Sequence, residues 1–241
     1  RLMTKNIRSL IGAMLMLMII PMVAGLLACM PVPIGDPERS RIDPDLTGPW
    51  IMDTGGEFNL YLFQPYDRRT WLVVGAQFEE GSEAEFDGLD LESADDVLAA
   101  LRTYPIGEDG ITSKTTILFK AWLTKLGGEQ FMTWEPLGGI RDDGSLTAQY
   151  WFVFKVVKEE SDRVGLYLMD PGFEGFADIT KPDEYEGDDY PGAMRRTWER
   201  AIRKHIEDNE IYEEQWTLHR VPPNDVESAA ELLEEVIGGL L

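Results

Sequence analysis

The feature that most constrains the fold is a set of short segments, rich in aromatic and branched residues, that are joined in pairs by turn residues. Residues 115–137, TTILFKAWLTKLGGEQFMTWEPL, contain two such segments on either side of Gly127 and Gly128. Residues 57–78 contain two more around Pro65. Paired segments of this kind predict antiparallel β-hairpins, because strands favour these side chains and tight turns favour glycine and proline.

A third predicted hairpin, residues 148–170, differs because both of its faces are apolar. Its first strand alternates between two sets of side chains, Tyr150, Phe152, Phe154 and Val156 on one face and Trp151, Val153, Lys155 and Val157 on the other. A strand of this kind is typical of a central position in a sheet that is covered on each side. It is equally typical of a strand that lines an interior while a helix covers its outer face.

Three segments predict helices. Ser93 and Asp96 form a capping box that starts a short helix. Residues 193–212 carry an apolar stripe at helical spacing, formed by Met194, Trp198, Ala201, Ile202 and Ile206. Residues 224–237 form a second amphipathic segment after a last predicted strand. The pattern therefore predicts an α+β fold, with a mainly antiparallel, curved or barrel-like sheet of about six to eight strands and two or three helices.

A basic opening and a long uncharged run precede this domain. Residues 9–30 carry no charge and include Leu26, Leu27, Ala28 and Cys29, of which Cys29 is the only cysteine in the chain. The sequence resembles the signal peptide of bacterial lipoproteins. The resemblance implies that a signal peptidase recognises Leu26, Leu27 and Ala28, that cleavage precedes Cys29, and that Cys29 carries lipid with acyl chains such as palmitate. A retained anchor is the alternative, because the run approaches the roughly 20 apolar residues that span a bilayer.

The lipoprotein resemblance divides the chain into three parts. Residues 1–28 are the expected signal peptide, residues 29–46 the lipidated cysteine with a flexible, proline-rich tether, and residues 47–241 a single periplasm-facing, β-rich domain. Met30 follows the cysteine, whereas aspartate in that position is the inner-membrane retention signal of enteric lipoproteins. We therefore expect a protein of the bacterial cell envelope that is lipid-anchored in the outer membrane and faces the periplasm.

The composition excludes some classes of function. The chain has 22 lysine and arginine residues against 44 aspartate and glutamate residues, a formal net charge of −22. Such a surface repels nucleic acid, so no nucleic-acid partner is expected. Once Cys29 is lipidated, the domain has no thiol for a disulfide, a cysteine-based zinc site or a cysteine nucleophile. No cofactor is expected.

A short motif stands before the first predicted strand. Gly48 and Trp50 form a Gly-x-Trp arrangement, which resembles the opening motif of lipocalins, small barrels that hold apolar ligands. The resemblance covers these three positions, and no other lipocalin motif can be placed. It implies a curved sheet, and Trp50, Phe152 and Phe154 are the residues expected to line its ligand cavity.

Three other groups of residues each allow two interpretations. The acidic runs 79–96 and 183–189 are calcium sites or solvated loops, and without EF-hand spacing we favour loops and expect no metal. The basic run 195–204 is a docking face for an anionic partner such as lipid headgroups, or it neutralises the acidic loop before it, which we favour. His205 and His219 could serve a hydrolase triad, but no hydrolase motif accompanies them and structural roles are favoured.

These observations predict a membrane-tethered lipoprotein of unknown activity, a non-enzymatic binding or cell-envelope module whose partner is an envelope protein. The first alternative is a lipocalin-like carrier of an apolar small molecule, and the second is an unrecognised hydrolase. The interior of the sheet distinguishes them. A cavity favours the carrier, a filled interior favours the module, and a cleft that joins a histidine to a buried carboxylate favours the enzyme.

Overall fold

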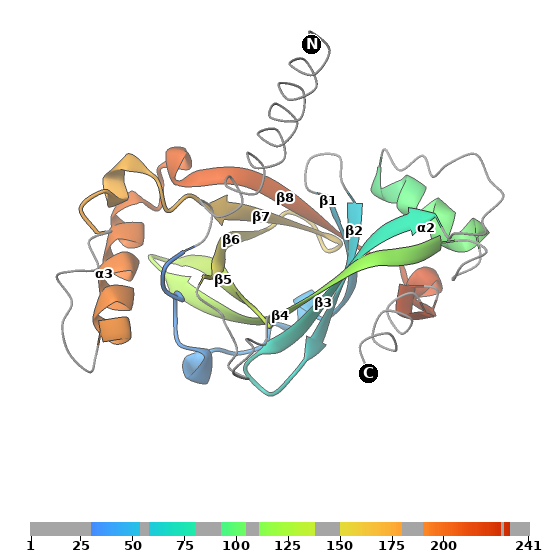
Figure 1. The fold of residues 1–241 in the computed structure, drawn as a ribbon, viewed down its shortest axis with the longest axis horizontal. Coiled ribbons are helices and arrows are strands. Elements are labelled where there is room, and N and C mark those ends of the chain that lie inside the picture. The colour runs from blue at the N-terminus through green and yellow to red at the C-terminus, as the bar shows by residue number, and fades with distance from the viewer. Residues whose placement is uncertain are drawn as a thin grey trace, which may run out of the picture.

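The computed structural model describes residues 30–53, 58–80, 93–104, 111–137, 150–179, 190–227 and 229–231. Eight antiparallel strands pair in chain order, and the last pairs with the first, which closes the sheet into a barrel (Figure 1). The strands are β1 (Gly48–Asp53), β2 (Phe58–Pro65), β3 (Trp71–Glu80), β4 (Ile111–Leu126), β5 (Glu129–Pro136), β6 (Phe152–Lys158), β7 (Arg163–Met169) and β8 (Tyr212–Arg220). The prediction of an antiparallel, barrel-like sheet is confirmed, with the strand number at the upper end of the expected range.

The three predicted hairpins are present as neighbouring strand pairs of the barrel. They correspond to β2 with β3, β4 with β5, and β6 with β7. Gly127 and Gly128 turn the chain between β4 and β5 with φ values of +59° and +98°, which glycine adopts without steric cost. The barrel closes where Trp50 of β1 pairs with Arg220 of β8.

The barrel interior is filled by side chains that pack around Trp134. The Trp134 side chain is 1% exposed. Its ring centroid lies within 6 Å of four other aromatic rings, at 5.5 Å from Tyr61, 5.8 Å from Phe63, 5.0 Å from Phe119 and 5.1 Å from Phe154. Tilted and edge-to-face ring pairs at these separations stabilise a fold by more than the burial of their surface alone. The described interior is thus a packed aromatic core.

Close packing inside the barrel requires a glycine at position 75 and changes the pKa of Tyr61. A Cβ atom on Gly75 would lie 2.6 Å from the Tyr61 ring, so only glycine lets that ring reach its position. Burial raises the pKa of Tyr61 to about 12, because the phenolate would lose its hydration inside the barrel.

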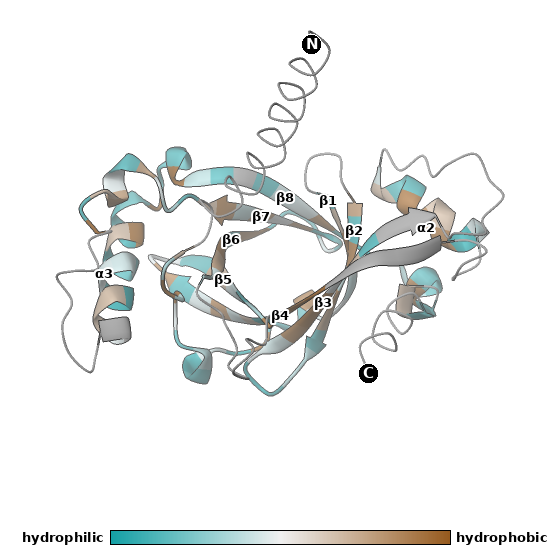
Figure 2. Ribbon diagram, viewed as in Figure 1, coloured by the Kyte–Doolittle hydropathy of each residue, from teal (hydrophilic) through white to brown (hydrophobic). Residues whose placement is uncertain are grey.

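Two helices cover the outside of the barrel on opposite sides (Figure 1). Helix α2 (Ala94–Thr103) begins at Ser93, whose hydroxyl accepts a hydrogen bond from the Asp96 amide at 3.2 Å, so the predicted capping box is confirmed. Helix α3 (Tyr190–His205) ends earlier than predicted, because the chain turns through the 3₁₀ helix Asn209–Ile211 into β8. Figure 2 shows apolar residues along the strands and hydrophilic residues in the turn between β2 and β3.

Helix α3 packs on the outer face of the sheet through its predicted stripe. Met194, Trp198, Ile202 and Ile206 are buried in one cluster with Phe131 and Val153. Phe131 and Val153 are outward neighbours of the inward-facing Met132 and Phe154. The hairpin with two apolar faces is therefore explained, because one face lines the barrel interior and the other is covered from outside.

Residues 30–43 run along the barrel wall, and we call this segment the strap. Met30 and Trp151 exchange two backbone hydrogen bonds of 2.7 and 3.1 Å. The Ile34 carbonyl accepts hydrogen bonds from the Trp122 indole at 3.0 Å and the Thr133 hydroxyl at 2.8 Å. Ile34 is fully buried. The sequence predicts a flexible tether over 29–46, whereas its described part contains two short 3₁₀ helices, Pro37–Arg39 and Pro44–Leu46, and is bound to the domain by these hydrogen bonds.

The chain after the strap closes one end of the barrel. The 3₁₀ helix Pro44–Leu46 places Leu46, which is 1% exposed, against the core. The Trp50 indole donates to the Leu46 carbonyl at 2.9 Å, and the Arg220 guanidinium lies 4.1 Å from the centre of the Trp50 ring. Arg220 also donates to the carbonyls of Thr47 and Asp45. A cation over an aromatic face thus joins the first and last strands to the segment that covers them.

The segment after β8 is held by an ion pair. The Asp225 carboxylate, in the short 3₁₀ helix Pro223–Asp225, accepts two hydrogen bonds from Arg102 of α2. The Arg102 guanidinium lowers the pKa of Asp225. Residues 226, 227 and 229–231 continue as helix, in agreement with the predicted tail helix. Within the described residues, no helix has the length and hydropathy needed to cross a bilayer.

The packing of the interior around the Trp134 ring can be tested by truncating that side chain. Trp134→Ala in the full chain, purified in detergent, should lower the free energy of unfolding by about 3–5 kcal/mol, because it leaves a large cavity in a packed core. The measurement is urea denaturation followed by circular dichroism, with Tyr66→Ala as control, since Tyr66 is 68% exposed. A Trp134→Ala loss as small as that of the control would show that the interior is not packed around this ring.

Candidate functional site: a basic groove beside the barrel

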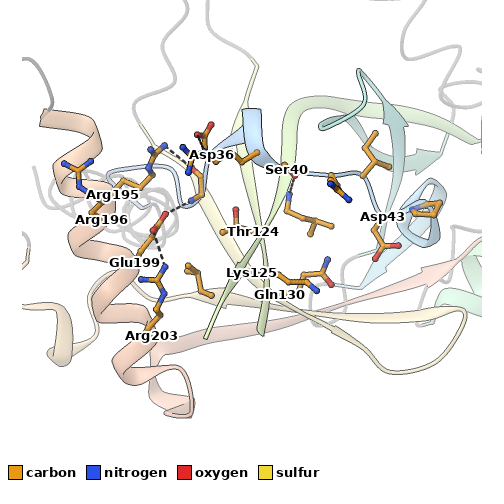
Figure 3. Close-up of a pocket in the computed structure, with 17 residues that line it drawn as sticks. Asp36, Ser40, Asp43, Thr124, Lys125, Gln130, Arg195, Arg196, Glu199 and Arg203 are labelled. Atoms are coloured by element: carbon orange, nitrogen blue, oxygen red, sulfur yellow. Dashed lines mark hydrogen bonds and ion pairs between the residues drawn. The ribbon is translucent and has the colours of Figure 1, made fainter. Parts of the chain in front are cut away.

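A hollow of about 860 Å³ lies at one end of the barrel, beside α3. The strap lines one side of it and α3 the other, and the end of β4 with the start of β5 lies between them, with Thr124 on the outward face of the sheet and Lys125 and Gln130 on the inward face. Figure 3 shows Arg195, Arg196, Glu199 and Arg203 along α3, with Thr124, Lys125 and Gln130 between α3 and the Ser40–Asp43 part of the strap. We call this hollow the basic groove.

Helical spacing explains why α3 presents a charged row to the basic groove. The apolar stripe turns Trp198 and Ile202 toward the barrel wall. Arg195, Glu199 and Arg203 recur every four residues beside that stripe, so they lie along one edge of the helix. Burial of the stripe therefore fixes the direction in which the charged row points.

Gly35 joins the strap to α3 at one end of the basic groove. Its amide donates to a Glu199 carboxylate oxygen at 3.2 Å, and its carbonyl accepts from Arg195 Nη1 at 3.2 Å. Its φ is +78°, and a Cβ atom there would lie 1.6 Å from Thr124 Oγ1. Only glycine satisfies both the backbone conformation and this contact.

Cations outnumber acids in the basic groove, although the chain as a whole is strongly acidic. Its six basic side chains are Arg39, Arg41, Lys125, Arg195, Arg196 and Arg203, and its three acidic side chains are Asp36, Asp43 and Glu199. In a chain of net charge −22, acidic side chains are expected to outnumber basic ones on most of the surface. The basic groove is thus a local positive region.

Each of the three acids is already engaged by a protein group. Asp36 accepts the Glu38 amide and pairs with Arg39 at 3.5 Å. Asp43 pairs with Lys158 at 2.9 Å, and hydrogen bonds from Lys158 to Asp45 and Asp43 raise the pKa of that lysine. Glu199 binds the Gly35 amide and lies 3.6 Å from Arg203. The negative charge in the basic groove is therefore largely compensated.

Two cations remain open to solvent. Arg41 and Lys125 are exposed, and neither has an ion-pair or hydrogen-bond partner among the residues that the structure describes. Guanidinium groups recognise phosphate and carboxylate oxygens through paired hydrogen bonds, and a lysine supplies a point charge. The chemistry of the basic groove therefore suits an anionic ligand.

The sequence-predicted site residues lie elsewhere. Trp50 and Phe154 are 1% and 0% exposed inside the barrel core, and Phe152 packs against the same core. They do come together in the interior, as the predicted cavity lining requires, but Trp134 packs against Phe154 at 5.1 Å. Leu26, Leu27, Ala28 and Cys29, and most of the two acidic runs, lie outside the described residues.

The two histidines are in structural surroundings. His205, at the end of α3, makes edge contacts with Phe173 at 5.3 Å and Phe176 at 6.2 Å. His219 lies in β8 opposite Ile51 and Arg163. Within the described part of the chain, no ion pair joins either histidine to a carboxylate, and no group of three histidine, cysteine or acidic residues could hold a metal ion.

Sequence analysis identified part of the basic groove but not its whole. The run 195–204 was recognised as a basic cluster with two interpretations, and Arg195, Arg196 and Arg203 do line the groove. Arg39, Arg41 and Lys125 were missed, because they come from a segment predicted to be a free tether and from a strand end. Gly35, between Ile34 and Asp36, is a local signal of the close contact that the strap makes.

The comparisons with known proteins give no family for the chain. No family model matches it, and no curated protein and no solved structure matches it significantly. The geometry and charge of the basic groove are therefore the features from which a function can be inferred.

Substitution of Gly35 tests the junction of strap and α3. Gly35→Ala should destabilise the full chain more than Gly128→Ala, whose φ of +98° carries similar backbone strain but whose Cβ would meet nothing within 4 Å. We expect the backbone strain to lower the free energy of unfolding by about 1–2 kcal/mol in each variant. The clash with Thr124 should lower it by about 1–3 kcal/mol more in Gly35→Ala. Urea denaturation in detergent measures both, and equal losses would contradict the contact.

Proposed function

We propose that the protein is a lipid-anchored, non-enzymatic binding module of the bacterial cell envelope, and that it binds an anionic ligand in the basic groove. The observation that carries the proposal is the convergence of six cations from the strap, the β4–β5 region and α3 on one groove of an acidic chain. Three separate segments of the chain contribute, so the arrangement depends on the folded domain and is more than a basic run in the sequence.

Two properties of the site support binding rather than catalysis. The described groove contains no histidine, and its carboxylates are held by the strap, Lys158 and Arg203 rather than placed as an acid and base pair. A catalytic acid or base has to meet the reacting atoms with an open proton site. The open groups here are the cations Arg41 and Lys125, which suit the binding of an anion.

The lipocalin-like carrier is the second candidate. An eight-stranded closed barrel is compatible with it. The packing of Trp134 against Tyr61, Phe119 and Phe154 weighs against it, because an apolar ligand would have to displace a ring that is 1% exposed. The basic groove requires no such displacement, because none of the four rings lines it.

The envelope location is a separate part of the proposal, and it depends on Cys29. The acidic surface repels anionic headgroups over the range set by the Debye length, about 8 Å at physiological salt, so an anchor is needed to keep the domain at a membrane. Two or three acyl chains on Cys29 supply such an anchor.

Intact mass spectrometry of membrane-extracted protein tests the anchor. In a bacterial host the wild-type chain should begin at Cys29 and carry diacylglyceryl and acyl groups, and Cys29→Ser should carry none. An uncut, unlipidated wild-type chain would overturn the lipoprotein assignment. It would favour the alternative, in which the uncharged run remains as an anchor.

Thermal stabilisation by inorganic tripolyphosphate tests the basic groove. A ligand near 100 times its Kd stabilises the native state by about 2.7 kcal/mol, which for a domain of this size raises Tm by about 5–10 °C. The full chain in detergent should show this shift. The double variant Arg41→Ala/Lys125→Ala should lose most of it.

The matched control is Lys204→Ala, which removes a cation from α3 that does not line the basic groove. This variant should keep the full shift. A shift that is equal in all three proteins would mean that tripolyphosphate acts as a general stabilising salt and would contradict a specific site.

A further inference from the structure

The end of the barrel opposite the basic groove carries apolar side chains that are open to solvent. β4 and β6 run in the same direction, because each is antiparallel to β5. Lys125 near the end of β4 lines the basic groove, and Lys158 at the end of β6 pairs with Asp43, which also lines it. At the other end, Ile117 of β4 is 42% exposed and Tyr150, just before β6, is 36% exposed.

Ile117 and Tyr150 continue the rows of side chains that fill the interior. Ile117 lies two residues before the inward-facing Phe119, and Tyr150 lies two residues before Phe152, which packs against the same core. The Phe152 ring connects the two rows, because its centroid is 6.1 Å from that of Phe119 and 6.0 Å from that of Tyr150. On β5 between them, the half-buried Pro136 lies opposite Phe119. We call Ile117, Pro136, Tyr150 and Phe152 the apolar rim.

The apolar rim and the basic groove lie far apart on the barrel. Ile117 and Lys125 are eight residues apart on β4. With a rise of about 3.3 Å per residue and a strand tilt of about 40°, this spacing corresponds to about 20 Å along the barrel axis. The two ends of the barrel therefore differ in chemistry, one apolar and the other cationic.

The strap begins at the apolar rim. Met30 exchanges its two backbone hydrogen bonds with Trp151, which stands between Tyr150 and Phe152 in the sequence. Met30 is fully buried. Cys29 is bonded to Met30, so its Cα atom lies about 3.8 Å from that of a residue fixed to the barrel wall. A lipid on Cys29 is thus attached beside the apolar rim, with no flexible spacer between lipid and domain.

We propose that the apolar rim rests on the membrane that holds the Cys29 lipid, and that the basic groove faces away from this membrane. The inference deepens the proposed function and rests on it. Tyrosine and apolar side chains are favoured at a membrane–water interface, where the ring is buried and the hydroxyl stays hydrated. Because the lipid already holds the rim at the surface, contacts too weak to bind a membrane alone suffice to orient the domain.

This orientation indicates where the ligand of the basic groove comes from. The basic groove is about 20 Å from the apolar rim, more than twice the Debye length of about 8 Å at physiological salt. The headgroups of the anchoring membrane are therefore too distant to contact or attract its cations. The ligand is then an anion from the aqueous phase.

The experiment labels the two ends of the barrel in turn. Because a lipidated Cys29 leaves no free thiol, a single introduced cysteine can be labelled with the fluorophore nitrobenzoxadiazole. Tyr150→Cys and Ile117→Cys each place the label on the apolar rim. The matched control is Ser161→Cys, an exposed position in the turn between β6 and β7, at the groove end of the same strand as Tyr150.

The labelled full chain, isolated with its lipid, is reconstituted into neutral phosphatidylcholine vesicles that contain a lipid with a nitroxide near the top of its acyl chain. The nitroxide should quench both rim labels at least about twofold, because groups at the interface lie within about 5–10 Å of the acyl boundary. It should leave the Ser161→Cys label unchanged. High salt should not alter the quenching, because the contact is apolar.

Equal quenching at both ends, quenching of Ser161→Cys alone, or no quenching in any variant would overturn the inference. A blue shift of the rim labels without quenching would place a second copy of the chain on the apolar rim and would overturn it as well. If Cys29 is lipidated and tripolyphosphate stabilises the chain through Arg41 and Lys125, such a result removes only the orientation. A Cys29 without lipid removes the anchor of the proposed function, and this inference with it.

Discussion

The rest of the structure depends on the way in which the closed barrel fills its own interior. Trp134 lies in the barrel interior and contacts rings from three other strands. A filled barrel of eight strands is a rigid wall rather than a container. Binding surfaces then have to be built on the outside, from segments that lie against the wall.

The strap and α3 build such a surface because each buries an apolar face against the same outer side of the sheet. Ile34 and Trp198 are both fully buried there. Their burial leaves the polar sides of two segments facing each other across the end of β4, and the contact of Gly35 with Arg195 and Glu199 holds one end of the basic groove closed. Packing fixes the positions of the cations, and the result is a local positive region in a chain of net charge −22.

Much of the fold could be predicted from the sequence, because hairpin signals are local. The turn at Gly127 and Gly128, the capping box at Ser93 and the stripe of α3 each depend on residues close together in the chain. The closure of β1 on β8 was not predictable, since a curved sheet and a closed barrel show the same alternation. The sequence also does not show which apolar residues face which side of the wall: Trp134 lies in the cluster inside the barrel, and Trp198 lies in a cluster outside it.

The basic groove was only partly predictable for a related reason. Its α3 side is a run in the sequence, whereas Arg41 and Lys125 are 84 residues apart. Lys125 lies at the end of β4, and Arg41 lies on the strap, whose proline content suggested a free tether. Four backbone and side-chain hydrogen bonds at Met30 and Ile34 hold that strap, and none of their partners is near it in sequence. Non-local contacts of this kind are set by the tertiary fold and leave little local trace.

The central claim is that the ligand binds in the basic groove and not in the filled barrel interior, and hydrogen–deuterium exchange of the full chain with and without tripolyphosphate tests it most directly. The structure predicts that the ligand slows exchange in peptides covering residues 35–44, 123–130 and 195–203, which line the basic groove. Exchange in peptides that carry the interior residues of β1, β2 and β6 should not change. Protection of those strands, with no change at the strap and α3, would place the ligand inside the barrel and contradict the account.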